Sequence, residues 1–177
     1  VPLTASSWDR NKGRPGPVEF AGNSILLKGM PHTNDRVRNG VSDGNYLSSK
    51  KTFNHVGATS YVKFKTSGAR RYQNVYVGPS GLPTARMTTH HSYARSKLIG
   101  ENTLYFSRVH LKENAEFKWV VASGNYDDKG GRVVFTQNGK ATAQQFNRMK
   151  AFPFRFAMSD NYGGRASTLT VYEVKLV

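Results

Sequence analysis

The chain lacks cysteine altogether, and this absence excludes several kinds of site. Without a thiol, its 177 residues hold no disulfide framework, no Cys-ligated metal centre and no Cys-based redox chemistry. Long apolar runs are also missing, since no stretch of about 18 residues is apolar enough for a transmembrane helix. The sequence begins Val1-Pro2-Leu3, without an initiator methionine or a signal-peptide pattern. We therefore expect a processed chain, or a module of a larger multi-domain protein.

Acidic residues are scarce, and no Asp or Glu occurs from Gly44 to Gly100, a stretch of 57 residues. The same stretch contains nine Lys and Arg, together with His55, His90, His91 and five of the nine tyrosines. The whole chain has a formal net charge of +15 and a pI of about 10.2. Such a bias predicts a surface that attracts a polyanion, because summed positive charge raises the local concentration of anionic partners.

What the chain does contain is a series of short runs of Val, Phe, Tyr and Thr, separated by Gly and Pro, and such runs are typical of strands. In Tyr61–Lys65, Val62 and Phe64 alternate with the tyrosine and lysines, which predicts a half-buried strand with a basic outer face. Asn138-Gly139 predicts a hairpin turn, and Thr142–Met149 a short helix. Strands are predicted at Val18–Ala21, Ser24–Lys28, Tyr46–Phe53, Ser60–Thr66, Asn74–Val77, Arg86–Tyr93, Thr103–Phe106, Glu116–Ala122, Arg132–Thr136, Phe154–Met158 and Thr168–Leu176.

Many short strands with a single short helix favour an all-β fold, a two-sheet antiparallel β-sandwich or jelly roll. We expect one domain over residues 1–177, with residues 1–17, which include Pro15 and Pro17, as an arm that wraps the surface. Trp119 lies in an apolar stretch and is expected in the core rather than at a ligand.

Several segments, in this order, resemble the strands of concanavalin A-like (laminin-G-like) jelly rolls. The segments are Leu47–Phe53, Gly57 with Tyr61–Lys65, Arg132–Lys140, Pro153–Met158 and Thr168–Val174. The resemblance covers roughly residues 45 to 177. It implies a concanavalin A-like sandwich and a carbohydrate context, because that superfamily includes proteins that bind and cleave polysaccharides.

The scarcity of carboxylates argues against a glycoside hydrolase. Such enzymes need two Asp or Glu flanking the scissile bond, and the E-x-D-x-x-E spacing that jelly-roll glycosidases use is absent. Asn125, Asp127 and Asp128 lie in a Gly-rich stretch and offer oxygen ligands for a structural calcium ion. The alternative is a polar hairpin turn, because Asn and Asp favour turns. No other cofactor is expected.

The basic stretch supplies the candidate ligand-binding residues. On a strand, His91, Tyr93, Arg95 and Lys97 share one face, which suits a carboxylate or sulfate because Arg binds such groups in a bidentate manner. A lyase could use the same face, with His91 or Tyr93 as base and Arg95 neutralising a uronate; the alternative is a solvated basic strand edge. Tyr72 and Tyr76 could stack on sugars, or pack against neighbouring strands. The full predicted set is Lys63, Lys65, Arg70, Arg71, Tyr72, Tyr76, Arg86, His91, Tyr93, Arg95 and Lys97.

These patterns lead to a non-catalytic carbohydrate-binding module that recognises an acidic polysaccharide, either a polyuronate or a sulfated glycan. The first alternative is a small lyase that cleaves a uronate polymer by β-elimination. The second is a capsid-like or nucleic-acid-associated jelly roll, although the chain shows no recognised nucleic-acid motif. No amphipathic helix for a membrane surface is visible. We also expect a bacterial protein that is secreted or located at the cell surface.

Overall fold

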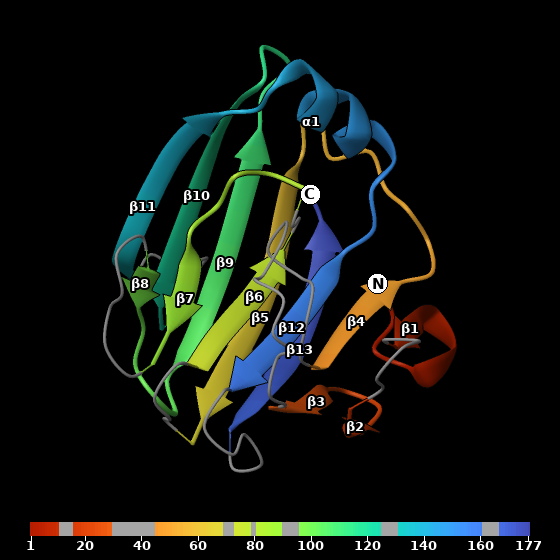
Figure 1. Cartoon of the computed structure of the whole chain (residues 1–177), viewed down its shortest axis with the longest axis vertical. Coiled ribbons are helices and arrows are strands. Elements are labelled where there is room, and N and C mark those ends of the chain that lie inside the picture. Colours follow the sequence, from red (N-terminus) through yellow and green to blue (C-terminus); the bar gives the residue numbers. More distant parts are fainter. Residues whose placement is uncertain are drawn as a thin grey trace.

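The protein is described here from a computed structural model that covers residues 1–10, 16–29, 45–68, 73–78, 81–89, 96–124, 131–160 and 167–177. At positions 73, 74, 78, 86, 96, 159 and 160 only the backbone is described. Two sheets pack face to face, and the helix α1 (Ala143–Arg148) lies at one end of the sandwich (Figure 1). The predicted two-sheet jelly roll is therefore confirmed.

The six-stranded sheet contains, in spatial order, β1 (Trp8–Arg10), β4 (Asn45–Ser49), β12 (Arg155–Asp160), β6 (Gln73–Gly78), β7 (Arg86–Thr88) and β8 (Ser96–Leu98). The seven-stranded sheet contains β11 (Arg132–Lys140), β10 (Glu116–Ser123), β9 (Leu104–Leu111), β5 (Thr59–Ser67), β13 (Thr168–Leu176), β3 (Ile25–Lys28) and β2 (Val18–Phe20). Two 3₁₀ turns, η1 (Ala5–Ser7) and η3 (Met149–Ala151), complete the described elements. Neighbouring strands are antiparallel except β7 and β8, which are parallel.

The alternation predicted for β5 is confirmed and shows how each strand divides its side chains. Val62 and Phe64 are fully buried between the sheets, whereas Lys63 and Lys65 lie half-buried on the outer side. Trp119 of β10 is also in the core, where its indole nitrogen donates to Ser107 Oγ at 2.9 Å. Apolar residues from both sheets fill one continuous cluster between the sheets.

The first ten residues do more than wrap the surface. Strand β1 pairs with β4 at the edge of the six-stranded sheet, and both Leu3 and Trp8 are buried in the core cluster. The Trp8 ring lies 4.9 Å from the ring of Phe156, and its nitrogen donates to the carbonyl of Pro2 at 2.8 Å. This N-terminal segment is therefore part of the packed sandwich.

The hairpin turn predicted at Asn138-Gly139 is wrong, because both residues lie inside β11 and pair with Lys118 and Phe117 of β10. A glycine is needed there for a packing reason: a Cβ atom at Gly139 would lie 2.5 Å from Cζ of the Phe117 ring. The predicted helix is confirmed, and it begins with a capping box between Thr142 and Gln145. In the described part of the chain, no helix has the length and apolar character needed to cross a membrane.

Candidate functional site

The outer face of the seven-stranded sheet is strongly basic. Strand alternation places cations from six strands on this face, namely Lys28, Lys63, Lys65, Arg108, Lys118, Lys140 and Lys175. The carboxylates at outward positions on the described strands of this sheet are those of Glu19, Glu116 and Glu173. Positive charge is therefore in excess over this surface, which favours an anionic ligand.

Two aromatic rings form the floor beneath these cations. Tyr61 and Phe106 are only 2% and 4% exposed although both point outward, and their ring centroids lie 5.9 Å apart. Lys175 Nζ is 4.6 Å and Arg108 Cζ 5.8 Å from the Tyr61 centroid. Lys63 Nζ lies 5.6 Å from the Phe106 centroid. The aliphatic stems cover the rings, and cation–π attraction holds the charged groups in place.

A shallow pocket of about 400 Å³ opens on this face beside two of the predicted ligand-binding residues. Its lining residues are Lys63, Lys65, Asn102, Leu104 and Tyr172; we call it the Lys65 pocket. It combines two ammonium groups, one amide and one phenol ring. Such a set can pair with an anionic group while an aromatic ring packs against an apolar surface of the ligand.

Two local backbone features shape the Lys65 pocket. Strand β13 has a bulge in which Tyr172 is the extra residue between the pairs Val171–Phe64 and Glu173–Lys63. A bulge changes the direction in which a side chain points, and here it adds Tyr172 to the outer face. Asn102 has a positive φ of 55°, a conformation that Asn tolerates better than most residues, and its N–H donates to the carbonyl of Thr66 at 2.7 Å.

Three carboxylates near this surface already have partners. Glu173 pairs with Lys175 at 3.1 Å, and Glu116 pairs with Lys112 at 3.8 Å. A carboxylate oxygen of Glu101 accepts the backbone N–H of Gly68 at 2.6 Å. Within the described residues, neither Lys63 nor Lys65 has an ion-pair partner. Their ammonium groups therefore remain available to a ligand.

A second pocket, of about 570 Å³, lies on the same sheet near the end of the β10–β11 pair. It is lined by Lys112, Glu116, Phe117, Lys118, Asn138, Gly139 and Lys140; we call it the Lys118 pocket. The three lysines of this lining offer positive charge, and one of them, Lys112, is paired with Glu116. This pocket was not anticipated from the sequence, because it depends on Asn138 and Gly139 lying in a strand.

The structure brings Lys63 and Lys65 together but places the other described candidates elsewhere. Tyr76 lies in the six-stranded sheet opposite Ala157 and is only 9% exposed. Lys97 lies beside Met87 at the edge of that sheet, and its Nζ is 5.8 Å from the ring centroid of Phe135 in β11. Lys97 therefore spans the open edge between the two sheets rather than joining the outer face that carries Lys63 and Lys65.

The remaining candidates are not positioned by the described structure. The backbone of Arg86 lies in β7, but its side chain is not described. The other predicted residues fall outside the described residues, namely Arg70, Arg71, Tyr72, His91, Tyr93 and Arg95, as do the calcium candidates Asn125, Asp127 and Asp128. Across the described ranges, no group of three or more His, Asp or Glu could hold a metal ion.

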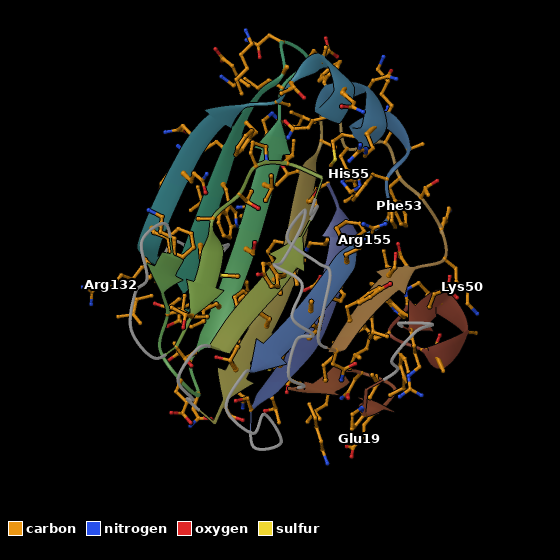
Figure 2. All side chains as sticks on the ribbon, in the orientation of Figure 1. Glu19, Lys50, Phe53, His55, Arg132 and Arg155 are labelled. Atoms are coloured by element: carbon orange, nitrogen blue, oxygen red, sulfur yellow. The ribbon has the colours of Figure 1, made fainter. Side chains whose placement is uncertain are left out.

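His55, which belongs to the acid-free stretch, is a buried structural residue and not part of the basic face. It lies at the end of the sandwich near α1, and Figure 2 shows it beside Phe53. Nε2 donates to the carbonyl of Phe152 at 2.9 Å, so Nδ1 of the neutral ring accepts from Ser60 Oγ at 2.8 Å. Burial lowers the pKa of His55 below its usual value, and the hydrogen bond to Phe152 offsets this only in part.

Comparison with known proteins shows the fold. No family model matches the sequence, and no curated protein matches it. Among solved structures, lectin UEA-II in complex with galactose has a TM-score of 0.59 at 5% identity, with 100% of this chain and 94% of that chain covered. β-Agarase A from Zobellia galactanivorans has a TM-score of 0.57 at 10% identity, with coverages of 98% and 83%.

A third similar structure is the exoplasmic/lumenal domain of VIP36 bound to Ca²⁺ and Man3GlcNAc. Its TM-score is 0.54 at 8% identity, and the match covers 98% of this chain and 83% of that chain. At such identities the similarity concerns the fold alone. The resemblance to concanavalin A-like jelly rolls is thereby confirmed.

Proposed function

We propose that the outer face of the seven-stranded sheet binds an acidic polysaccharide without cleaving it. The observation that carries this proposal is the Lys65 pocket, where Lys63 and Lys65, without ion-pair partners among the described residues, lie beside the ring of Tyr172. A carboxylate or sulfate on a sugar would pair with the lysines. The sugar ring would pack against the tyrosine, which offers an apolar face and a polar hydroxyl.

The sugar component of the proposal is supported by the similar structures. One of them is a lectin complexed with galactose, one is an agarase, and one is a domain bound to Man3GlcNAc. The acidic component is supported by the charge of the surface, because a neutral glycan gains little from a net charge of +15. Binding without cleavage is supported by the described residues that line the Lys65 pocket, none of which is a carboxylate for a hydrolytic pair.

Isothermal titration calorimetry with alginate, heparin and neutral agarose tests the proposal. We expect both acidic polymers to bind, and their affinity to fall steeply as salt is added, because exposed charges are screened. The double variant Lys63→Gln/Lys65→Gln should bind an acidic polymer about tenfold more weakly, since each exposed ion pair contributes up to about 1 kcal/mol.

The matched control is Lys50→Gln/Lys150→Gln, which removes two exposed lysines outside the seven-stranded sheet: Lys50 directly follows β4 (Figure 2), and Lys150 lies in η3. It should retain nearly all the affinity. Equal affinity for agarose, or binding that is insensitive to salt, would contradict the proposal. Ultraviolet absorbance of the same mixtures separates binding from the lyase alternative, because β-elimination creates an unsaturated product that absorbs and binding does not.

A further inference from the structure

Five cations on the outer face of the seven-stranded sheet follow one diagonal line. Lys65 and Lys63 lie two residues apart on β5. Lys63 is opposite Phe106, so the next outward residue of β9, Arg108, is its diagonal neighbour. By the same registers Lys118 of β10 is diagonal to Arg108, and Lys140 of β11 is diagonal to Lys118. We call these five residues the cationic diagonal.

The spacing along the cationic diagonal is regular. Diagonal neighbours on one face of an antiparallel pair lie about 7–8 Å apart, and residues two apart on a strand are separated by about 7 Å. The whole line therefore extends over roughly 30 Å and crosses four neighbouring strands, β5, β9, β10 and β11. A monosaccharide would occupy one step, whereas a linear polymer with regularly repeated charges could contact all of them.

Each end of the cationic diagonal opens into a pocket. The Lys65 pocket contains its first two members, Lys65 and Lys63. The Lys118 pocket contains its last two, Lys118 and Lys140. The two pockets share no lining residue, and Arg108 lies on the line between them. The surface therefore has two separate pockets that can bind an anionic group, and Arg108 lies between them.

The middle of the cationic diagonal is held in place before any ligand arrives. Lys63 lies over Phe106 and Arg108 lies against Tyr61, and both rings are almost fully buried. A cation that rests on a buried ring has less freedom to lose when it pairs with an anion, which favours binding. Glu173 lies opposite Lys63 and Glu116 lies opposite Lys140, but both carboxylates form ion pairs with lysines outside the line, Lys175 and Lys112.

We infer that the ligand is an extended acidic polysaccharide chain that crosses the sheet along the cationic diagonal and is anchored in both pockets at once. This inference rests on the proposed function and specifies it: the site recognises an internal stretch of a linear polymer rather than a chain end or a single charged sugar. Two linked contacts act as one bivalent interaction, because binding in the first pocket raises the effective concentration at the second.

Alginate oligomers of defined length, titrated at constant salt, test the inference. A disaccharide can occupy only one pocket, whereas a dodecasaccharide is long enough to reach both. We expect the dodecasaccharide to bind about a hundredfold more tightly than the disaccharide. A longer chain also gains affinity from its greater number of binding positions, but that gain is only about tenfold and is the same for every variant.

The double variant Lys118→Gln/Lys140→Gln should lose the hundredfold gain of the dodecasaccharide and keep only the gain that comes from the number of binding positions. Arg108→Gln should lose part of the hundredfold gain. Lys50→Gln/Lys150→Gln is the matched control and should keep the full gain; circular dichroism checks that every variant is folded. The inference is overturned if the Lys118→Gln/Lys140→Gln variant keeps the hundredfold gain, or if the native protein does not show it. In either case, binding of the polymers would still support the proposed function. Failure of every alginate and heparin sample to bind overturns the proposed function itself.

Discussion

At the scale of single residues, His55 shows how a titratable group can serve packing alone. Its ring accepts from Ser60 on β5 and donates to the carbonyl of Phe152, which lies just before β12. The ring also packs edge-on against Phe154, with centroids 5.2 Å apart. His55 therefore connects the two sheets at one end of the sandwich, and burial favours its neutral form, in which one nitrogen donates and the other accepts.

This arrangement predicts a loss of stability in acid. The pKa of His55 is lowered in the folded protein, whereas the unfolded chain keeps the usual value of 6.5. As pH falls below 6.5, the unfolded state binds a proton that the folded state does not. The free energy of unfolding should then fall by up to about 1.4 kcal/mol per pH unit, until the folded-state pKa is reached.

Urea unfolding of the native protein and of His55→Gln at several pH values measures this contribution. Glutamine offers a donor and an acceptor but does not titrate, so the difference between the two proteins isolates His55 from the other histidines. The free energy of unfolding of the native protein should fall relative to that of His55→Gln as pH is lowered below 6.5. If the free energy of unfolding changes with pH in the same way for the two proteins, His55 does not contribute to the pH dependence of stability.

At the scale of elements, β11 shows what strand alternation can and cannot predict. Alternation identified β5, because Val62 and Phe64 are core residues and their neighbours are charged. The strand predicted for β11 ends too early, at Thr136, because Asn138-Gly139 is a strong turn signal when only local sequence is considered. The glycine is required instead by the ring of Phe117, which lies on another strand. Local sequence cannot predict that contact.

Gly139→Ala tests this explanation. The added Cβ would lie 2.5 Å from Cζ of Phe117, so either the ring or the strand must move. Overpacking of this kind costs about 1–3 kcal/mol of unfolding free energy, which chemical denaturation can measure. Adding Phe117→Leu should make the alanine less costly, because the smaller side chain vacates the space. Purely additive effects of the two substitutions would mean that the ring is not the cause.

Local sequence likewise predicts some residues of the candidate site, whereas others depend on the tertiary structure. Lys63 and Lys65 could be predicted, because period two in β5 places them outward. Tyr172 was missed, although the apolar residues of β13 change from a spacing of two, at Leu169 and Val171, to a spacing of three at Val174, which marks the bulge. The diagonal that joins β5 to β11 depends on strand order and register, which one sequence does not specify.

At the scale of the whole molecule, the question is whether a ligand responds to total charge or to its arrangement. The net charge of +15 creates a positive potential around the protein that attracts any polyanion at low ionic strength. At about 0.15 M salt the Debye length is only about 8 Å, so distant charges are screened and direct contacts dominate. The two contributions can therefore be separated by salt and by charge placement.

Two charge-matched variants make this separation. Lys63→Glu/Lys65→Glu and Lys50→Glu/Lys150→Glu each replace two positive by two negative charges, so both lower the net charge from +15 to +11. At low salt both should bind heparin more weakly than the native protein, because both reduce the overall potential. At about 0.15 M salt the Lys50/Lys150 variant should regain native affinity, whereas the Lys63/Lys65 variant should stay at least about tenfold weaker. Equal losses for the two variants at both salt concentrations would mean that net charge alone attracts the polymer and that the arrangement of cations on the seven-stranded sheet is not a binding site.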